Sequence, residues 1–195
     1  MWFYWTLFLV PAALALTESW NPIDPRTRLR GLGVSVAWFA VLIGFALIIG
    51  LRHEIGADWG SYLRKLDGVD GLSLKQTLLL PDPGYQFLNW LSLQAGLGIY
   101  GVNLIAGLIF MTGLTLFCRS TPRPWLALVV AIPYLFMVVA MGFSRQGIAM
   151  GFVMLALVAL SRASRGWFVA WVLIGATFHK TAIVLLPLVV LVTGL

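Results

Sequence analysis

Three short polar segments interrupt a mostly apolar sequence, and each contains side chains that could bind an anion or move a proton. They are Arg52–Trp59, Ser144–Gln146 and Phe178–Lys180. An arginine presents a planar fork of N–H donors that matches phosphate oxygens and keeps its charge. A carboxylate or an imidazole, such as Asp58 or His179, can accept a proton from a hydroxyl group. These side chains break the apolar pattern at helix ends, and they are therefore the candidates for chemistry in this chain.

Each of these residues also has a purely structural explanation. Arg145 lies between two apolar runs, and its long stem could carry the charge to the membrane interface, whereas a charge at a helix centre costs about 2.5–3.5 kcal/mol. His179 could likewise be an interface anchor, and Asp58 could cap the helix that follows it. A simple turn does not require an arginine between Ser144 and Gln146, so we favour a functional role for Arg145.

The composition indicates that lipid is the solvent for much of this chain. Hydrophobic residues make up 61% of the sequence and charged residues only 10%, against about 25% charged residues in soluble domains. The formal net charge of +6 would raise nucleic acid as a partner of a soluble protein. Basic residues in loops orient membrane proteins, so we expect no nucleic-acid binding here.

The apolar runs predict an all-α, polytopic membrane helix bundle with about seven membrane helices in a single domain over residues 1–195. The runs are Trp2–Thr17, Gly33–Leu51, Val102–Cys118, Trp125–Phe143, Gln146–Leu160, Trp167–Phe178 and Thr181–Leu195. Short loops rich in arginine and proline, such as Asn21–Arg30, read as cytoplasmic. Because the sequence stops inside an apolar run, we expect that a C-terminal part of the fold is missing.

One loop, about residues 52–84, is longer than the others and contains helix-forming stretches at Asp58–Leu66 and Ser73–Leu80. Gly84–Tyr100 follows it and is ambiguous: it could span the membrane or lie in the interface as an amphipathic helix. If it is interfacial, all three polar segments fall on one membrane face. That convergence favours the interfacial interpretation.

Other features indicate no chemistry. Gly96–Gly101 matches a dinucleotide-binding pattern by letter, but it follows no predicted strand, so we interpret it as a turn. Gly147 and Gly151 fit a small-residue packing face between membrane helices. Cys118 is interpreted as a small apolar residue. The histidines and the cysteine are too scattered for a zinc site, so we expect neither a metal nor a cofactor.

Taken as a set, the polar segments resemble the motifs of EpsG-type exopolysaccharide polymerases. The first motif, R-x-x-x-G-x-D-x-x-x-Y, matches Arg52, Gly56, Asp58 and Tyr62. Ser144–Gln146 with Ala149 is similar to the second motif, and Phe178–Ala182 is similar to the third. The order and spacing agree from about residue 35 to the end of the chain.

The resemblance implies a multi-pass glycosyltransferase of the bacterial inner membrane, similar to the Wzy type and independent of metal. Such an enzyme joins oligosaccharide repeat units carried on polyprenyl diphosphate at the extracytoplasmic face, where the loop of about residues 52–84 would lie. Its partners would be the bilayer, the lipid-linked oligosaccharide and other polysaccharide export proteins.

The chemistry of that reaction assigns a role to each candidate residue. Arg145 and Arg52 would bind the diphosphate, helped by Lys180. Asp58 or His179 would be the general base. The remaining candidates for substrate binding are Gln146, Glu54 and the aromatic residues Tyr62, Trp59 and Trp90, whose rings could stack on sugars.

Three other functions compete with a polymerase. A transporter or flippase of lipid-linked sugars would place polar groups near the middle of the membrane, whereas the polar groups here lie at helix ends. A non-catalytic membrane subunit of a polysaccharide assembly complex would tolerate substitution of all three polar segments. A different glycosyltransferase with a lipid-phosphate donor would not leave single lipid-linked repeat units behind when it is deleted.

Overall fold

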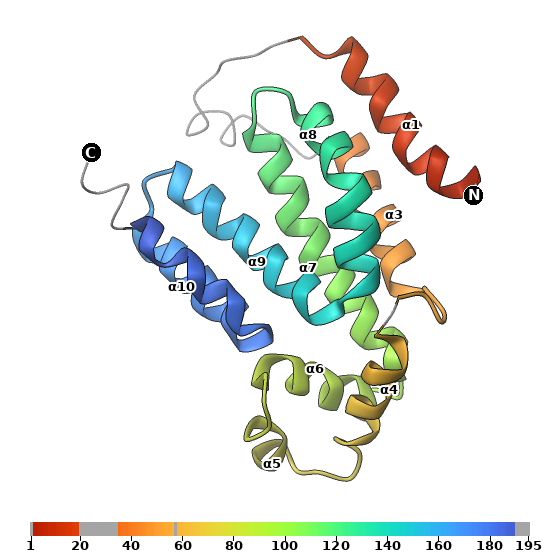
Figure 1. Ribbon diagram of the computed structural model, residues 1–195, viewed down its shortest axis with the longest axis vertical. Coiled ribbons are helices and arrows are strands. Elements are labelled where there is room, and N and C mark those ends of the chain that lie inside the picture. Colours follow the sequence, from red (N-terminus) through yellow and green to blue (C-terminus); the bar gives the residue numbers. More distant parts are fainter. Residues whose placement is uncertain (1, 20–34, 57, 190–195) are drawn as a thin grey trace.

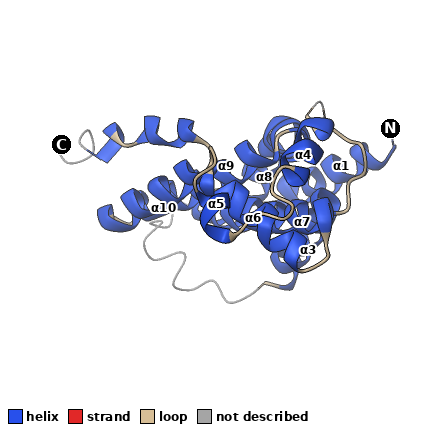
Figure 2. Cartoon of the chain, turned by 90° about the horizontal axis from the view of Figure 1, so that it is seen from below, coloured by secondary structure: helices blue, strands red, loops and turns tan. Residues whose placement is uncertain are grey.

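All regular elements of the described chain are helices, as the sequence predicts (Figures 1 and 2). A computed structural model describes residues 2–19, 35–56 and 58–189. In chain order the helices are α1 (Trp2–Thr17), α3 (Val36–Gly50), α4 (Trp59–Asp67), α5 (Leu74–Leu78), α6 (Pro83–Gln94), α7 (Gly98–Ser120), α8 (Pro124–Ala131), the π-helix η1 (Ile132–Ala140), α9 (Ser144–Ser161), α10 (Arg165–Phe178) and the 3₁₀-helix η2 (Lys180–Leu185). An apolar chain becomes helical because a helix satisfies its own backbone hydrogen bonds.

The helix bundle is consistent with a membrane protein, but the expected seven spans are not confirmed. Within the described residues, α7 and α9 are long and apolar enough to cross a bilayer, and five apolar helices are shorter. The expected seventh run begins as the short helix η2, and residues 190–195 lie outside the described chain. The loop expected to be cytoplasmic near residues 21–30 lies outside it as well.

Helix α7 runs through the bundle and packs closely on α3 and α9 through glycines. A methyl group on Gly107 would lie 2.8 Å from the carbonyl oxygen of Ala46 in α3, and one on Gly151 would lie 2.8 Å from that of Ile109 in α7. A methyl group on Gly113 of α7 would overlap the backbone of Gly151. Such close backbone approach is how small residues bring membrane helices together. The predicted packing role of Gly151 is thus confirmed.

Helices α4, α5 and α6 form a separate layer below the bundle in Figure 1. They confirm the predicted helical stretches of the long loop, and α6 turns one side inward, with Tyr85, Leu88 and Asn89 buried. At 12 residues, α6 measures about 18 Å, against about 30 Å for the hydrocarbon core of a bilayer. The interfacial interpretation of Gly84–Tyr100 stays a prediction; α6 forms the first part of this segment, and α7 begins at Gly98.

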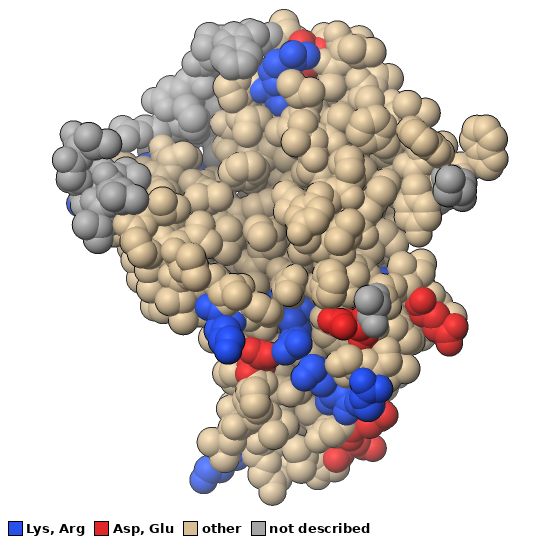
Figure 3. All heavy atoms as spheres, in the orientation of Figure 1, with Lys and Arg blue, Asp and Glu red and all other residues tan. Residues whose placement is uncertain are grey.

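Charged side chains are concentrated near the two ends of the molecule (Figure 3). On the face shown in Figure 3 they gather over the α4–α6 layer and the adjoining helix ends, a smaller group lies at the opposite end, and the broad middle is almost entirely uncharged. At the start of α8, the backbone N–H groups of Trp125 and Leu126 donate hydrogen bonds to the carboxylate of Glu18, which follows α1. An uncharged belt between two polar ends is the arrangement that a bilayer requires.

We predict that Gly113→Ala destabilises the bundle, because the added methyl group overlaps the backbone of Gly151. Overpacking of this kind costs about 1–3 kcal/mol, so the unfolding temperature of the purified protein should fall by roughly 5–10 °C. The matched control is Gly44→Ala in α3, where a methyl group meets nothing within 4 Å and should be neutral or stabilising. Equal thermal stability of the two variants would contradict the packing argument.

Candidate site at the end of the helix bundle

The guanidinium of Arg52 ties three helices together where the bundle meets the α4–α6 layer. Arg52 follows α3 and is 4% exposed. It donates to the carbonyl oxygen of Ala140 at the end of η1 over 2.8 Å, to Oδ1 of Asn103 in α7 over 3.1 Å, and to Oγ of Ser144 at the start of α9. Ser144 in turn donates to Oδ1 of Asn103 over 3.1 Å. Arg52 thereby fixes the break between η1 and α9.

Arg52 carries its charge inside the protein rather than at an open surface. Burial lowers the pKa of its guanidinium, and the nearby Tyr62 and Tyr85 oppose this effect. A buried charge persists only when its hydrogen bonds are satisfied, which the bonds to Ala140, Asn103 and Ser144 achieve in large part. The side chain is thus positioned to hold these helix ends together.

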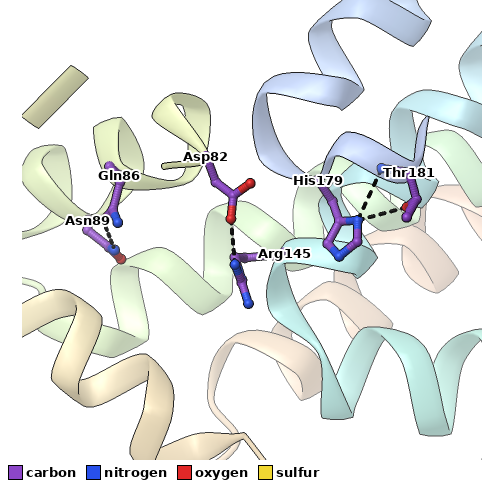
Figure 4. A network of polar contacts seen from close by, with 6 residues as sticks. All are labelled: Asp82, Gln86, Asn89, Arg145, His179 and Thr181. Atoms are coloured by element: carbon purple, nitrogen blue, oxygen red, sulfur yellow. Dashed lines mark hydrogen bonds and ion pairs between the residues drawn. The ribbon is translucent and has the colours of Figure 1, made fainter. Parts of the chain in front are cut away.

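Arg145 is a partly exposed cation, and it pairs with a residue that the sequence alone did not point to. Its Nη1 forms an ion pair with Oδ2 of Asp82, and the two side chains are 26% and 22% exposed (Figure 4). Asp82 has a positive φ of 59° and lies between Pro81 and Pro83. Aspartate tolerates this left-handed conformation better than most residues, and the turn aims its carboxylate at Arg145.

Two buried tyrosines form the inner wall beside Arg145. Tyr62 of α4 and Tyr85 of α6 lie with ring centroids 5.6 Å apart, and Tyr62 is only 2% exposed. Burial raises the pKa of the Tyr62 hydroxyl, while Arg145 beside it lowers this pKa and Asp58 raises it again. Tyr62 therefore stays protonated between a cation and an anion, and its buried ring is not available to stack on a sugar as we expected.

His179 directly follows α10, and Figure 4 draws it on the opposite side of Arg145 from Gln86 and Asn89. Its Nδ1 is 2.7 Å from Oγ1 of Thr181 and accepts a bond from the Thr181 backbone N–H over 3.4 Å. When Nδ1 accepts this bond, a neutral imidazole carries its proton on Nε2. In that form His179 can donate one hydrogen bond, through Nε2.

The remaining predicted residues lie at the rim. Asp58 occupies the N-cap position of α4, yet its half-buried carboxylate makes no capping bond within the described residues, so the expected cap is wrong. His53 packs edge-on against Trp59, with its Nδ1 2.8 Å from the hydroxyl of Tyr100 and its Nε2 3.9 Å from Glu54. These exposed aromatic groups extend the site away from Arg145.

Three further residues were predicted to bind substrate, and the structure shows the surroundings of each. The indole N–H of Trp90 donates to the carbonyl of Leu72 over 3.2 Å and pins the loop before α5, which leaves its ring half-buried. Lys180 is exposed at the start of η2. Gln146 is exposed one residue after Arg145 and lines a cavity with His179. In the described ranges, no three His, Cys, Asp or Glu residues gather to bind a metal ion.

The three polar segments lie in a region that matches a known protein family. Residues 35–194 match the EpsG family. The chain belongs to the EpsG family. The match covers Arg52, Arg145 and His179, which places all three polar segments inside the shared region, and it leaves α1 outside. Neither the curated proteins nor the solved structures that were compared gave a significant match.

For this EpsG-family protein we predict that Arg52→Leu is strongly destabilising, since it leaves Asn103 and Ser144 without their buried donor. Breaking a buried charged network by removing one partner costs about 3–5 kcal/mol. Thermal unfolding in detergent should reveal the loss. Arg64→Leu on the exposed side of α4 is the matched control and should be within about 0.5 kcal/mol of the native protein. An unchanged unfolding temperature for Arg52→Leu would show that the network does not hold the bundle.

Proposed function

We propose that this protein polymerises polyprenyl-diphosphate-linked oligosaccharide units into exopolysaccharide by glycosyl transfer, as a multi-pass protein at the extracytoplasmic face of the bacterial inner membrane. Membership in the EpsG family points to an exopolysaccharide polymerase-type function in a membrane. The observation that carries the specific proposal is the half-exposed Arg145, paired with Asp82 at the end of an apolar bundle.

Arg145 is well placed to hold a diphosphate. It lies in the first turn of α9, an 18-residue helix, whose N-terminus presents free N–H groups and partial positive charge to an anion. Asp82 occupies the guanidinium while no substrate is bound. An arriving diphosphate replaces this single carboxylate with several oxygens, which suits the five donors of the arginine.

The reaction transfers a sugar chain from one lipid carrier to another. The oxygen of an acceptor hydroxyl attacks the anomeric carbon of the donor chain, a new C–O bond forms, and the bond from that carbon to the diphosphate oxygen breaks. The hydroxyl proton passes to a general base, and the lipid diphosphate leaves with the bonding electrons. Negative charge grows on the leaving diphosphate, so donors that face it stabilise the transition state most.

The two candidates for the general base differ in their hydrogen bonding. Asp58 is partly exposed and its carboxylate makes no capping bond, so it is free to accept a proton. His179 receives the Thr181 N–H on Nδ1 and presents Nε2–H in its neutral form, which suits donation to a phosphate oxygen. We therefore assign Asp58 as the base and His179 as a second diphosphate donor beside Arg145.

The position of these groups argues against a flippase. A flippase needs polar groups in the middle of the membrane, whereas Arg52, Asp82 and Arg145 all lie where the bundle meets the α4–α6 layer. Chemistry on a lipid headgroup needs polar groups at the end of the membrane helices, where the headgroup lies. A non-catalytic subunit would not require a half-exposed arginine held in a fixed ion pair.

The first test of the proposal is Arg145→Ala in a strain that lacks the native gene. We expect polymer to disappear and single lipid-linked repeat units to accumulate, with a rate loss of roughly a hundredfold or more, as when one transition-state donor is removed. Polymer length on gels and the lipid-linked intermediates by mass spectrometry measure this outcome. Arg64→Ala, on the outer side of α4, is the control and should make normal polymer.

Membrane abundance of each variant must be measured in parallel. Normal polymer from Arg145→Ala at native abundance would remove Arg145 from the mechanism. Activity that persists after substitution of Asp58, Arg145 and His179 together would favour the non-catalytic subunit. A strain without the gene that accumulates no single repeat units would favour a different glycosyltransferase.

We also predict that Asp82→Asn strengthens binding of a free diphosphate lipid, because the anion no longer competes with a carboxylate for Arg145. Two unit charges about 4 Å apart interact by several kcal/mol near a protein surface, and a gain of about tenfold in affinity requires only part of that energy. Calorimetric titration of the detergent-solubilised protein with farnesyl diphosphate measures the change. Weaker binding would instead show that Asp82 is needed to orient Arg145.

A further inference from the structure

A cavity of about 260 Å³ adjoins the site on the side of His179. Its walls come from η1, from α9 and from η2, three elements that meet next to the break where Arg145 lies. Gln146 and His179 line it at the end nearest the site, and Tyr134, which is 66% exposed, lies at its outer side. The cavity therefore lies next to the polar site, because Gln146 directly follows Arg145, and the exposure of Tyr134 places part of its wall at the surface of the bundle.

The walls become less polar with distance from Arg145. Gln146, Ala149, Met150 and Val153 line the cavity from α9, and their spacing of three and four residues places them on one helical face. From Gln146 to Val153 this face extends about 10 Å along the helix axis. It begins with an amide and continues with purely apolar side chains.

Helix η2 repeats the same gradient on the opposite wall. His179 and Thr181 come first, and Ala182 and Leu185 follow as the chain leaves the site. Both walls thus change from polar to apolar in the same direction. Water needs two to four polar partners to occupy a cavity stably, and the far part of this one offers almost none. A ligand with an anionic head and a hydrocarbon tail fits both ends.

The third wall is an unusual helix. Residues Ile132–Ala140 form a π-helix, nine residues long, and Pro133 near its start cannot donate a backbone hydrogen bond. π-helical turns are rare and occur frequently at functional sites. Tyr134 and Val139 of this helix line the cavity opposite η2.

We propose that this cavity binds the isoprenoid segment next to the diphosphate of the lipid-linked substrate, with the diphosphate at Arg145, Gln146 and His179 and the hydrocarbon between α9 and η2. This inference rests on the proposed function, which supplies the lipid carrier. It adds that the carrier reaches the site sideways from the bilayer, past Tyr134. A phospholipid acyl chain is the competing occupant, and the experiment below separates the two.

The test is photo-crosslinking of the whole protein, in nanodiscs, with farnesyl diphosphate that carries a diazirine on its isoprenoid chain. Mass spectrometry of the adducts should locate them on α9 near Met150 and Val153 and on η2 near Leu185. Two variants fill the cavity from different walls: Val153→Phe and Ala182→Leu. Each should lower the crosslinking yield roughly tenfold, which corresponds to about 1.4 kcal/mol of lost binding.

The matched control is Leu173→Phe on the outer side of α10, where the side chain is 50% exposed; this variant should crosslink like the native protein. Thermal unfolding of all variants identifies any loss caused by misfolding, and two filling variants on separate helices keep the test open if one of them does not fold. Adducts confined to other helices, or undiminished yields in a folded filling variant, would overturn the inference.

Competition distinguishes the two lipid sources. Excess unlabelled farnesyl diphosphate should abolish the crosslink, whereas added phosphatidylglycerol should not. Equal displacement by phosphatidylglycerol would make the cavity a general phospholipid site and overturn the inference. Crosslinking requires no polymerisation, so its failure is distinct from failure of the proposed function, which the polymer made by Arg145→Ala tests separately.

Discussion

The structure depends on one buried guanidinium. Arg52 joins Ala140, Asn103 and Ser144, and through them it joins the ends of α3, η1 and α9 to the middle helix α7. A charge in an apolar interior is tolerated only where its donors are used, so the three helix ends cannot separate without exposing it. The break between η1 and α9 is therefore held in one geometry. The backbone of Arg145, the next residue after Ser144, is held in place with it.

The same constraint explains where function can lie in this molecule. The described helices carry apolar side chains over most of their length. On the face shown in Figure 3 most charged groups gather over the α4–α6 layer and the adjoining helix ends (Figures 1 and 3). This end can offer hydrogen bonds to a charged headgroup, while the adjoining cavity changes from amide and imidazole to aliphatic side chains. A substrate that is itself half ionic and half hydrocarbon matches this gradient.

Much of this arrangement could be predicted from the sequence, because apolar runs and the polar segments between them are strong signals. The helices and the meeting of the first two polar segments at Arg52 and Ser144 follow from such patterns, whereas the interfacial placement of Gly84–Tyr100 stays a prediction. The roles of individual residues were harder to predict: Arg52 and Tyr62 are buried rather than open, and Asp82 and Asn103 were missed. Asn103 had a signal, as a lone amide in an apolar helix, whereas the pairing of Asp82 with Arg145 depends on a tertiary turn that no local pattern encodes.

Gly84, at the start of α6, allows this helix to approach the end of α10 closely. A methyl group on Gly84 would lie 3.0 Å from the ring of Phe178 and would overlap Thr177, so the start of α6 rests directly on the end of α10 with no slack. Asp82 lies just before that contact and His179 just after it. The contact between α6 and α10 thus holds the resting counter-ion of Arg145 and the imidazole of His179 next to the same seam, so the two ends of the seam share one point of support.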